Sequence, residues 1–134
     1  MALLTELTRL NLGGNDVGAG GAASLAPALS RLSRLAHLSL HTSGIGAAGA
    51  AVLAPALGRL TELTLLHLGH NSVGDDGLQQ LAPALARLTG LKDLYLGDNG
   101  AHASAVDALR ARLPASVWEA SDLHRERLWA QRDG

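Results

Sequence analysis

Four of the six histidines in this 134-residue chain could act together. His37 and His41 lie on one expected strand and His67 on its neighbour, with His70 just beyond, so all four could share one sheet face. Diagonal neighbours across a sheet lie about 7–8 Å apart, within range of joint zinc or nickel coordination. No carboxylate on these two strands completes a ligand set. We therefore predict that these histidines simply face solvent. The alternatives are a metal-binding face and a face that senses pH as its imidazoles change charge.

A glycine-rich motif is similar to a cofactor-binding loop. Residues 44–49 read Gly-Ile-Gly-Ala-Ala-Gly, a literal G-x-G-x-x-G between an expected strand and an expected helix, which is where a dinucleotide-binding loop lies. However, the last two glycines recur at the equivalent positions of the units before and after, both of which lack the first glycine, and no acidic residue ends the following strand. The glycines are therefore expected to relieve backbone crowding, and no cofactor is predicted.

Catalytic side chains are also present without a complete site. Ser39, His67 and Asp93 have the residue types of a catalytic triad on three successive expected strands, but open-faced side chains offer no oxyanion hole or water-excluding pocket. The chain has no cysteine, which excludes a thiol nucleophile, a thiolate zinc site and a disulfide framework. The sequence therefore predicts a protein that is not an enzyme.

The elements that must position these side chains come from an internal repeat. The segment Leu7-Thr-Arg-Leu10-Asn-Leu12 returns three times at one constant spacing, starting again at Leu35, Leu63 and Leu91. Every unit continues with a polar position (Asn15, Ser43, Asn71, Asn99), and the first three continue with a G-x-x-G pair and the segment L-A-P-A-L. A fixed period of this length means that each unit buries its apolar face against its neighbours.

Each unit predicts a short strand and then a helix. In L-x-L the leucines alternate with residues that face solvent, and the second half carries leucines at helical spacing. Pro27, Pro55 and Pro83 fall in that half. Because proline inside a helix costs about 3 kcal/mol or more, we expect each helix to start late or bend there. The asparagines are expected to satisfy the turn backbone, with the shorter Ser43 leaving that ladder incomplete.

These residues closely resemble the ribonuclease-inhibitor type of leucine-rich repeat, over roughly residues 4 to 113. The resemblance implies an α/β solenoid, a short right-handed horseshoe arc with parallel strands on the concave face and helices on the convex face, and it implies protein binding at the concave face. Two departures are the absence of the cysteine that family members often place in the turn, and the small number of repeats. We predict one domain over 1–134, with repeats at 7–34, 35–62, 63–90 and 91–113 and a C-terminal cap at 114–134.

The two ends of the array carry separate predictions. Trp118 and Trp129 are expected on one face of the cap, sealing the last leucine layer. Ser116 with Glu119 matches a helix capping box, although 117–119 could instead form a closing strand. At the other end, the edge at Leu7, Leu10 and Leu12 lacks a cap, which favours either a second copy of the chain there or a longer array.

Charge narrows the class of partner. A net charge of -1 lacks the excess of Lys and Arg that a nucleic-acid binder needs. The start of the chain does not resemble a secretory signal, and no apolar run approaches a membrane span, so the expectation is a cytoplasmic protein with no membrane contact. Arg31, Arg59 and Arg87 share one register. They are expected to be solvated helix ends, with an acidic partner surface as the alternative.

The function favoured by the sequence is a non-catalytic protein-protein interaction module. Its alternatives are the metal-binding or pH-sensing face and a fragment of a larger leucine-rich-repeat receptor or effector. The partner is expected at the outward strand positions, with Tyr95 as the best anchor because aromatic residues often dominate interface energy. These positions are Arg9, Asn11, His37, Ser39, His41, Leu65, His67, Lys92, Asp93 and Tyr95.

Overall fold

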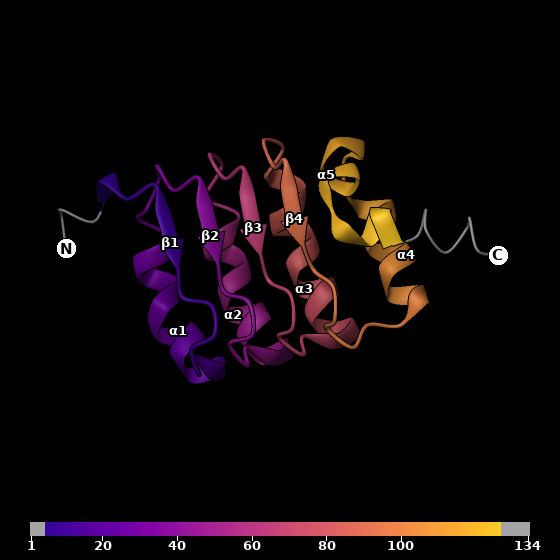
Figure 1. Cartoon of the computed structure of the whole chain (residues 1–134), viewed down its shortest axis with the longest axis horizontal. Coiled ribbons are helices and arrows are strands. Elements are labelled where there is room, and N and C mark those ends of the chain that lie inside the picture. The colour runs from indigo at the N-terminus through magenta and orange to yellow at the C-terminus, as the bar shows by residue number, and fades with distance from the viewer. Residues whose placement is uncertain (1–4, 127–134) are drawn as a thin grey trace.

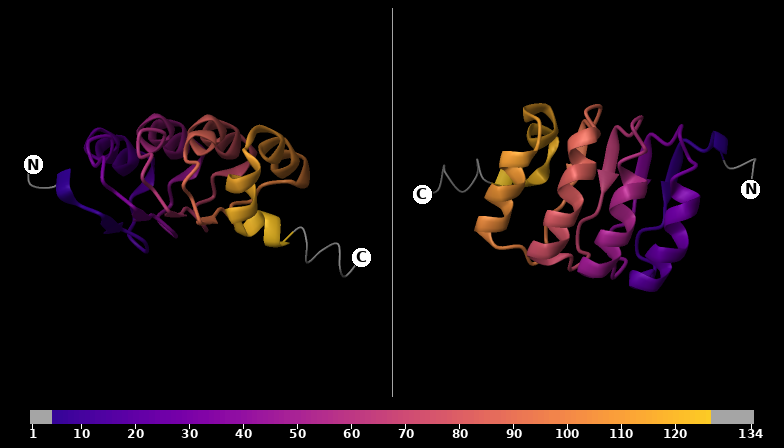
Figure 2. Two further views of the ribbon diagram at one scale, coloured as in Figure 1. Left: turned by 90° about the horizontal axis from the view of Figure 1, so that it is seen from above. Right: turned by 180° about the vertical axis from the view of Figure 1, so that it is seen from behind.

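Each repeat unit folds as a short strand followed by a helix in the computed structural model, which describes residues 5–126. The elements are β1 (Arg9–Asn11), α1 (Gly18–Leu29), β2 (His37–Ser39), α2 (Gly46–Leu57), β3 (Leu65–His67), α3 (Gly74–Arg87), β4 (Asp93–Tyr95), α4 (Ala103–Arg112) and α5 (Ala115–Ala120). The strands form one side of the molecule and α1 to α4 the other (Figures 1 and 2). The predicted α/β solenoid is confirmed.

The sheet is parallel, with its strands in chain order from β1 to β4. Every strand residue pairs with its equivalent in the next repeat, so Leu10, Leu38, Leu66 and Leu94 form one line across the sheet. Because side chains alternate along a strand, this line points into the core and the flanking positions point outward. The sheet therefore presents the same two outward positions from each repeat.

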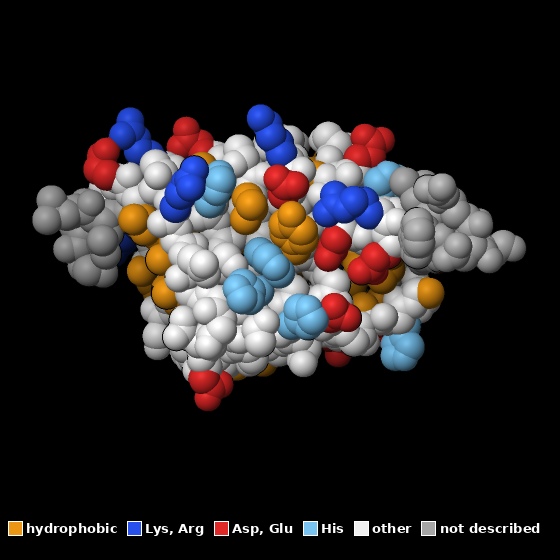
Figure 3. Space-filling model, viewed as in Figure 1, with side chains coloured by type: hydrophobic (Ala, Val, Ile, Leu, Met, Phe, Trp, Pro, Cys, Tyr) orange, Lys and Arg blue, Asp and Glu red, His pale blue; other side chains and the backbone are white. Residues whose placement is uncertain are grey.

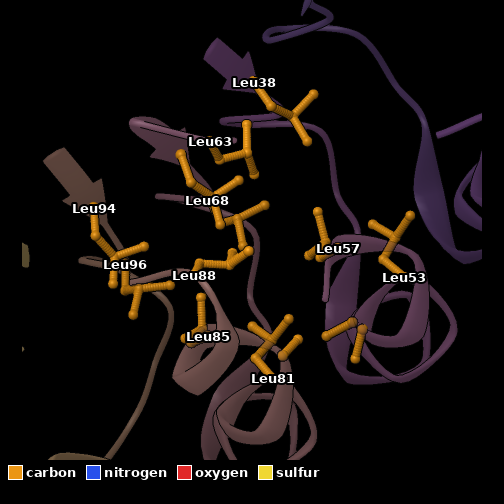
Figure 4. Packing of buried hydrophobic residues seen from close by; sticks show 14 of the residues in the cluster. Leu38, Leu53, Leu57, Leu63, Leu68, Leu81, Leu85, Leu88, Leu94 and Leu96 are labelled. Carbon is orange, nitrogen blue, oxygen red and sulfur yellow. The ribbon is translucent and has the colours of Figure 1, made fainter. Parts of the chain in front are cut away.

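The core is aliphatic and lies between the strands and the helices. Leucines of α2 and α3 pack toward leucines that flank the strands (Figure 4). Leu38, Leu66 and Leu94 are fully buried, whereas Leu10 of β1 is only partly buried. Full burial of a leucine contributes roughly 1.5–3 kcal/mol, so the β1 edge gains less from its leucines than the inner repeats do.

A ladder of buried asparagines joins successive turns. The Asn71 side chain donates to the carbonyls of Leu40 (2.8 Å) and Leu68 (3.0 Å), and its Oδ1 accepts the N–H of Ser43 (2.9 Å). Asn99 makes the equivalent bonds one repeat later, including acceptance of the Asn71 N–H at 2.8 Å. The predicted backbone role of the asparagines is thus confirmed.

The prolines lie near the C-terminal ends of α1, α2 and α3, so the expected late helix start is wrong. Pro27, Pro55 and Pro83 are exposed. The carbonyl that each proline leaves without a helical N–H partner therefore lies on the solvent side of its helix. Water can serve that carbonyl, which reduces the cost of proline at these positions.

The glycines of the G-x-G-x-x-G segment have a conformational and packing role. Gly46, the first residue of α2, has φ of 68°, in the region that favours glycine. A Cβ at Gly49 would lie 2.5 Å from Cγ2 of Ile45. The first glycine of each G-x-x-G pair therefore permits the turn, and the second permits close packing, as the sequence indicated.

The C-terminal cap closes the last leucine layer with α5. Trp118 is 4% exposed and belongs to the core cluster, as expected, while Trp129 lies outside the described residues. The predicted capping box is wrong, because the helix begins at Ala115 with Pro114 as its N-cap and without a side-chain cap bond. A closing strand at 117–119 is also wrong, since these residues are helical.

The edge of β4 is instead covered just after α5. Ser121 makes a parallel bridge with Leu94. The Asp122 carboxylate then accepts the N–H groups of Leu96 (2.8 Å) and Gly97 (3.0 Å). In the inner repeats the N–H equivalent to that of Leu96 donates to a carbonyl of the next repeat, so Asp122 replaces the missing neighbour.

Candidate protein-binding face

The outward positions of the four strands form two rows across the sheet. The first row contains Arg9, His37, Leu65 and Asp93, and the second contains Asn11, Ser39, His67 and Tyr95. His41 lies two residues beyond the end of β2, and the exposed Lys92 precedes β4. We call these ten residues the concave face. The structure brings together on one surface the eight strand positions and His41, and places Lys92 next to them at the start of β4.

Three rings stack across the middle of this face. The centroids of His41 and His67 are 4.9 Å apart, and those of His67 and Tyr95 are 4.7 Å apart. The guanidinium carbon of Arg125, from the cap, lies 5.9 Å from the Tyr95 ring centroid. Figure 3 shows histidine and hydrophobic side chains gathered in the middle of the face. Sequence reasoning missed Arg125, because it lies outside the repeat period.

His67 is held in one tautomer. Its Nδ1 accepts the N–H of Gly69 at 3.2 Å, so the ring proton of the neutral form resides on Nε2. Burial lowers the pKa of His67 below its usual value, and the nearby imidazoles of His41 and His70 lower it further, whereas Asp122 acts in the opposite direction. The row is therefore built around a neutral imidazole at pH 7.

Glycines leave space for the rings. A Cβ at Gly13 would lie 2.2 Å from Nε2 of His41, and a Cβ at Gly69 would lie 2.9 Å from Cε1 of His67. Either contact is too close for a real side chain, so any larger residue would displace a ring. Sequence reasoning missed this role, although the glycine after L-x-L in three of the four repeats was a visible signal.

The four histidines do not form one cluster. His37 lies in the first row beside Arg9 and Leu65, and His70 pairs with Asp98 at 3.2 Å. His41 and His67 pack ring against ring. Over residues 5–126, no group of three or more His, Cys, Asp or Glu residues is arranged to hold a metal ion.

Ser39, His67 and Asp93 do not form a catalytic triad either. Ser39 and His67 are paired neighbours in the second row, but Asp93 lies in the first row, paired with Leu65. Within the described part of the chain, no hydrogen bond joins any two of the three side chains. The face thus contains the residue types without a general base oriented by a carboxylate.

A shallow depression of about 330 Å³ lies between the first two strands and Leu65. Arg9 and His37 line it together with the polar side chains of Asn11 and Ser39, and no carboxylate lines it. Leu65 is half-buried, so an apolar wall adjoins a basic and hydrogen-bonding floor. This half of the face can accept an acidic or carbonyl-bearing group beside an apolar one.

The opposite half of the face has an acidic margin. Burial raises the pKa of Glu126, and the nearby carboxylates of Asp122 and Asp98 raise it further. These three residues lie beyond β4, at the side of the face closed by the cap, where Figure 3 shows acidic side chains. The charge of the concave face therefore differs between its two sides, which are basic near β1 and acidic beyond β4.

A family model for the leucine rich repeat matches residues 4–26 and 60–82. The starts of the two matches are separated by two full periods of the repeat, so both matches fall in the same register. A search of curated proteins finds no match to the chain. No helix within the described residues is both long and apolar enough to cross a bilayer. Leucine-rich repeats generally serve as protein-interaction modules, and the family is typically non-enzymatic. With four parallel strand-and-helix units in register and two matched repeats, the chain has the fold of a leucine-rich-repeat protein.

Proposed function

We propose that this chain is a non-catalytic interaction module that binds a protein partner through its concave face. The observation that carries the proposal is the stacked row of His41, His67 and Tyr95 at the centre of that face. Its resemblance to the ribonuclease-inhibitor type of repeat also supports a contact on the strand side. The proposal requires no cofactor.

Rigidity makes this row suitable as an anchor. Each ring already contacts a neighbour, and the Gly69 N–H holds the His67 imidazole, so little side-chain entropy remains to be lost on binding. Tyr95 offers a large ring and a hydroxyl, a combination enriched in energetically dominant contacts. Leu65 adds an apolar contact next to the row.

The size of the face limits the contact. Four strands spaced about 4.8 Å apart present a surface roughly 15–20 Å across. That width fits one helix or one loop of a partner. The basic margin near β1 and the acidic margin beyond β4 would orient such an element, since opposite charges on the partner would favour one direction across the strands.

Affinity capture with site-specific crosslinking tests this proposal. The bait chain carries a photoreactive phenylalanine analogue at position 65, next to the row, and parallel captures use this bait without a further change, with His67→Ala/Tyr95→Ala and with His102→Ala. His102 is exposed and precedes α4, away from the strands, so it controls for loss of a histidine. We expect a crosslinked protein whose capture falls at least about tenfold in the double variant and is unchanged in the control.

Two results would contradict the proposal. Capture that is undiminished in the double variant, with an unchanged circular dichroism spectrum, would show that the partner binds elsewhere. Crosslinking at position 65 without any dependence on His67 and Tyr95 would likewise contradict the proposed anchor.

A second copy of the chain at β1 is a further candidate partner. β1 is the edge of the sheet, and Leu7, Leu10 and Leu12 are only partly buried. A second β1 edge would cover these leucines and pair free backbone groups. Light scattering that finds a strict monomer at high protein concentration would exclude this homodimer.

A further inference from the structure

A second surface lies on the convex side of the molecule. A groove of about 530 Å³ runs between α2 and α3, over the half of each helix that contains its proline. Ala51, Pro55 and Pro83 contribute to its apolar lining, and Arg59 and Arg87 supply its only charges, because no carboxylate lines it. This groove is thus apolar and cationic, and it lies opposite the concave face.

The two arginines belong to a ladder with Arg31. All three are exposed and occupy the same register of successive repeats. Arg31 and Arg59 lie two residues beyond the ends of α1 and α2, and Arg87 ends α3, so all three lie where a helix dipole favours a cation. Within the described residues none of the three makes a salt bridge. Their charges are therefore available for carboxylates of a partner.

Arg87 is held across the groove in advance of any ligand. Its Nε donates to the carbonyl of Gly58 at 3.1 Å, which leaves the two terminal nitrogens of the guanidinium for another acceptor. A Cβ at Gly58 would lie 3.5 Å from Cδ of Arg87, so the side chain packs directly on this glycine. Such anchoring lowers the entropy cost of binding a carboxylate.

In the next groove along the solenoid, a side chain of the chain itself binds the carbonyl that the helix proline leaves without a partner. Between α3 and α4, Arg112 donates to the carbonyl of Gln79 at 3.3 Å. Pro83 leaves that carbonyl without its helical N–H partner. One repeat earlier, Pro55 leaves the Ala51 carbonyl in the same state, but Ala84 stands where Arg112 would be. The groove between α2 and α3 therefore combines two cations with a backbone acceptor that no side chain covers.

We propose that this convex groove and ladder bind an acidic segment of a partner protein in the polyproline II conformation, with carboxylates at every third residue. Packed helices lie about 8–10 Å apart, and a polyproline II segment has three residues per turn and advances about 3.1 Å per residue, so every third side chain lies on the same side. Three residues therefore span one repeat. Carboxylates at that spacing meet Arg31, Arg59 and Arg87 in turn, and each guanidinium can make a two-pronged contact. A donor from the segment reaches the Ala51 carbonyl.

Fluorescence anisotropy with three labelled peptides tests the spacing. The first has glutamate at every third position and serine elsewhere, the second has the same composition with consecutive glutamates, and the third has glutamine for glutamate. At low salt, where screening is weak, we expect the spaced peptide to bind the full chain about tenfold more tightly than the clustered one, because it forms two further pairs. The neutral peptide should not bind.

Two matched variants locate the site. Arg59→Gln/Arg87→Gln should weaken binding of the spaced peptide about tenfold, whereas Arg34→Gln/Arg110→Gln removes the same charge outside both the groove and the concave face and should leave binding unchanged. All four side chains are exposed, and melting curves check folding. If one variant is destabilised, the comparison of the spaced and clustered peptides on the wild-type chain still tests the proposed carboxylate spacing.

Several outcomes would overturn the proposal. They are equal affinity for the spaced and clustered peptides, no binding of the spaced peptide at millimolar concentration, and equal loss in the two double variants. A single-stranded DNA oligonucleotide of equal charge that binds more tightly than the spaced peptide would also overturn it, because the ladder would then recognise phosphate.

Discussion

Replacing Asn71 by alanine tests whether the polar ladder stabilises the solenoid. Three groups lose their side-chain partner in this variant, and the described residues offer them no other one: the N–H groups of Ser43 and Ile45 and the carbonyl of Leu40. The carbonyl of Leu68 keeps its bond from Asn99. An unsatisfied buried group costs about 1–3 kcal/mol, so Asn71→Ala should destabilise the chain by about 4 kcal/mol.

This loss is large for a domain whose total stability is about 5–15 kcal/mol. At about 3–4 °C per kcal/mol for a chain of this size, the melting temperature should fall by about 10–15 °C. Urea denaturation followed by circular dichroism measures the free energy of unfolding directly. The control is Asn15→Ala, where an exposed side chain loses a 2.9 Å bond to Leu12 and little else. Equal destabilisation by the two variants would refute the argument.

Three further predictions use the same measurements. Ser43→Asn should raise the free energy of unfolding by about 1 kcal/mol by completing the ladder, and a clear drop in melting temperature would contradict it. Asp122→Ala should cost about 2–4 kcal/mol, because two N–H groups at the β4 edge lose their acceptor. The pKa of His67 is lower in the folded state than in the unfolded state. Below pH 6.5 the unfolded state therefore binds more protons, and the free energy of unfolding decreases as the pH is lowered. His67→Gln should flatten that fall below pH 6.5, and an unchanged slope would refute the assignment.

The fold was predictable because one period governs the whole array. Residues one period apart must occupy equivalent places, so the line of Leu10, Leu38, Leu66 and Leu94 follows directly from the repeat. Alternation along each strand then places the intervening residues outward. The membership of the concave face was therefore predictable before any contact within it was known.

Contacts between outward side chains were not predictable in the same way. Alternation places His41 and His67 on one face, but their stacking depends on ring orientation, and that orientation depends on space above Gly13 and Gly69. The protonation state of His67 follows from a backbone N–H two residues away. Such short-range geometry has no periodic signal.

Departures from the period were the hardest features to predict. Asp122 substitutes for a missing strand through a side chain, and it lies in the cap, where neighbouring repeats no longer constrain the interpretation. The prolines misled for a different reason. A general penalty for proline in helices does not consider where the freed carbonyl points, and here it points to solvent or, at Gln79, to Arg112.

The two proposed surfaces should act independently because the leucine core separates them. The concave face lies on the strands and the arginine ladder beyond the helices, with fully buried leucines in between. Substitutions that share no partner usually add. Combining His67→Ala/Tyr95→Ala with Arg59→Gln/Arg87→Gln should therefore reduce capture at position 65 no more than the first pair does, and reduce peptide affinity no more than the second pair does. Coupling between the two readouts would mean that one partner spans both faces, and it would contradict separate sites.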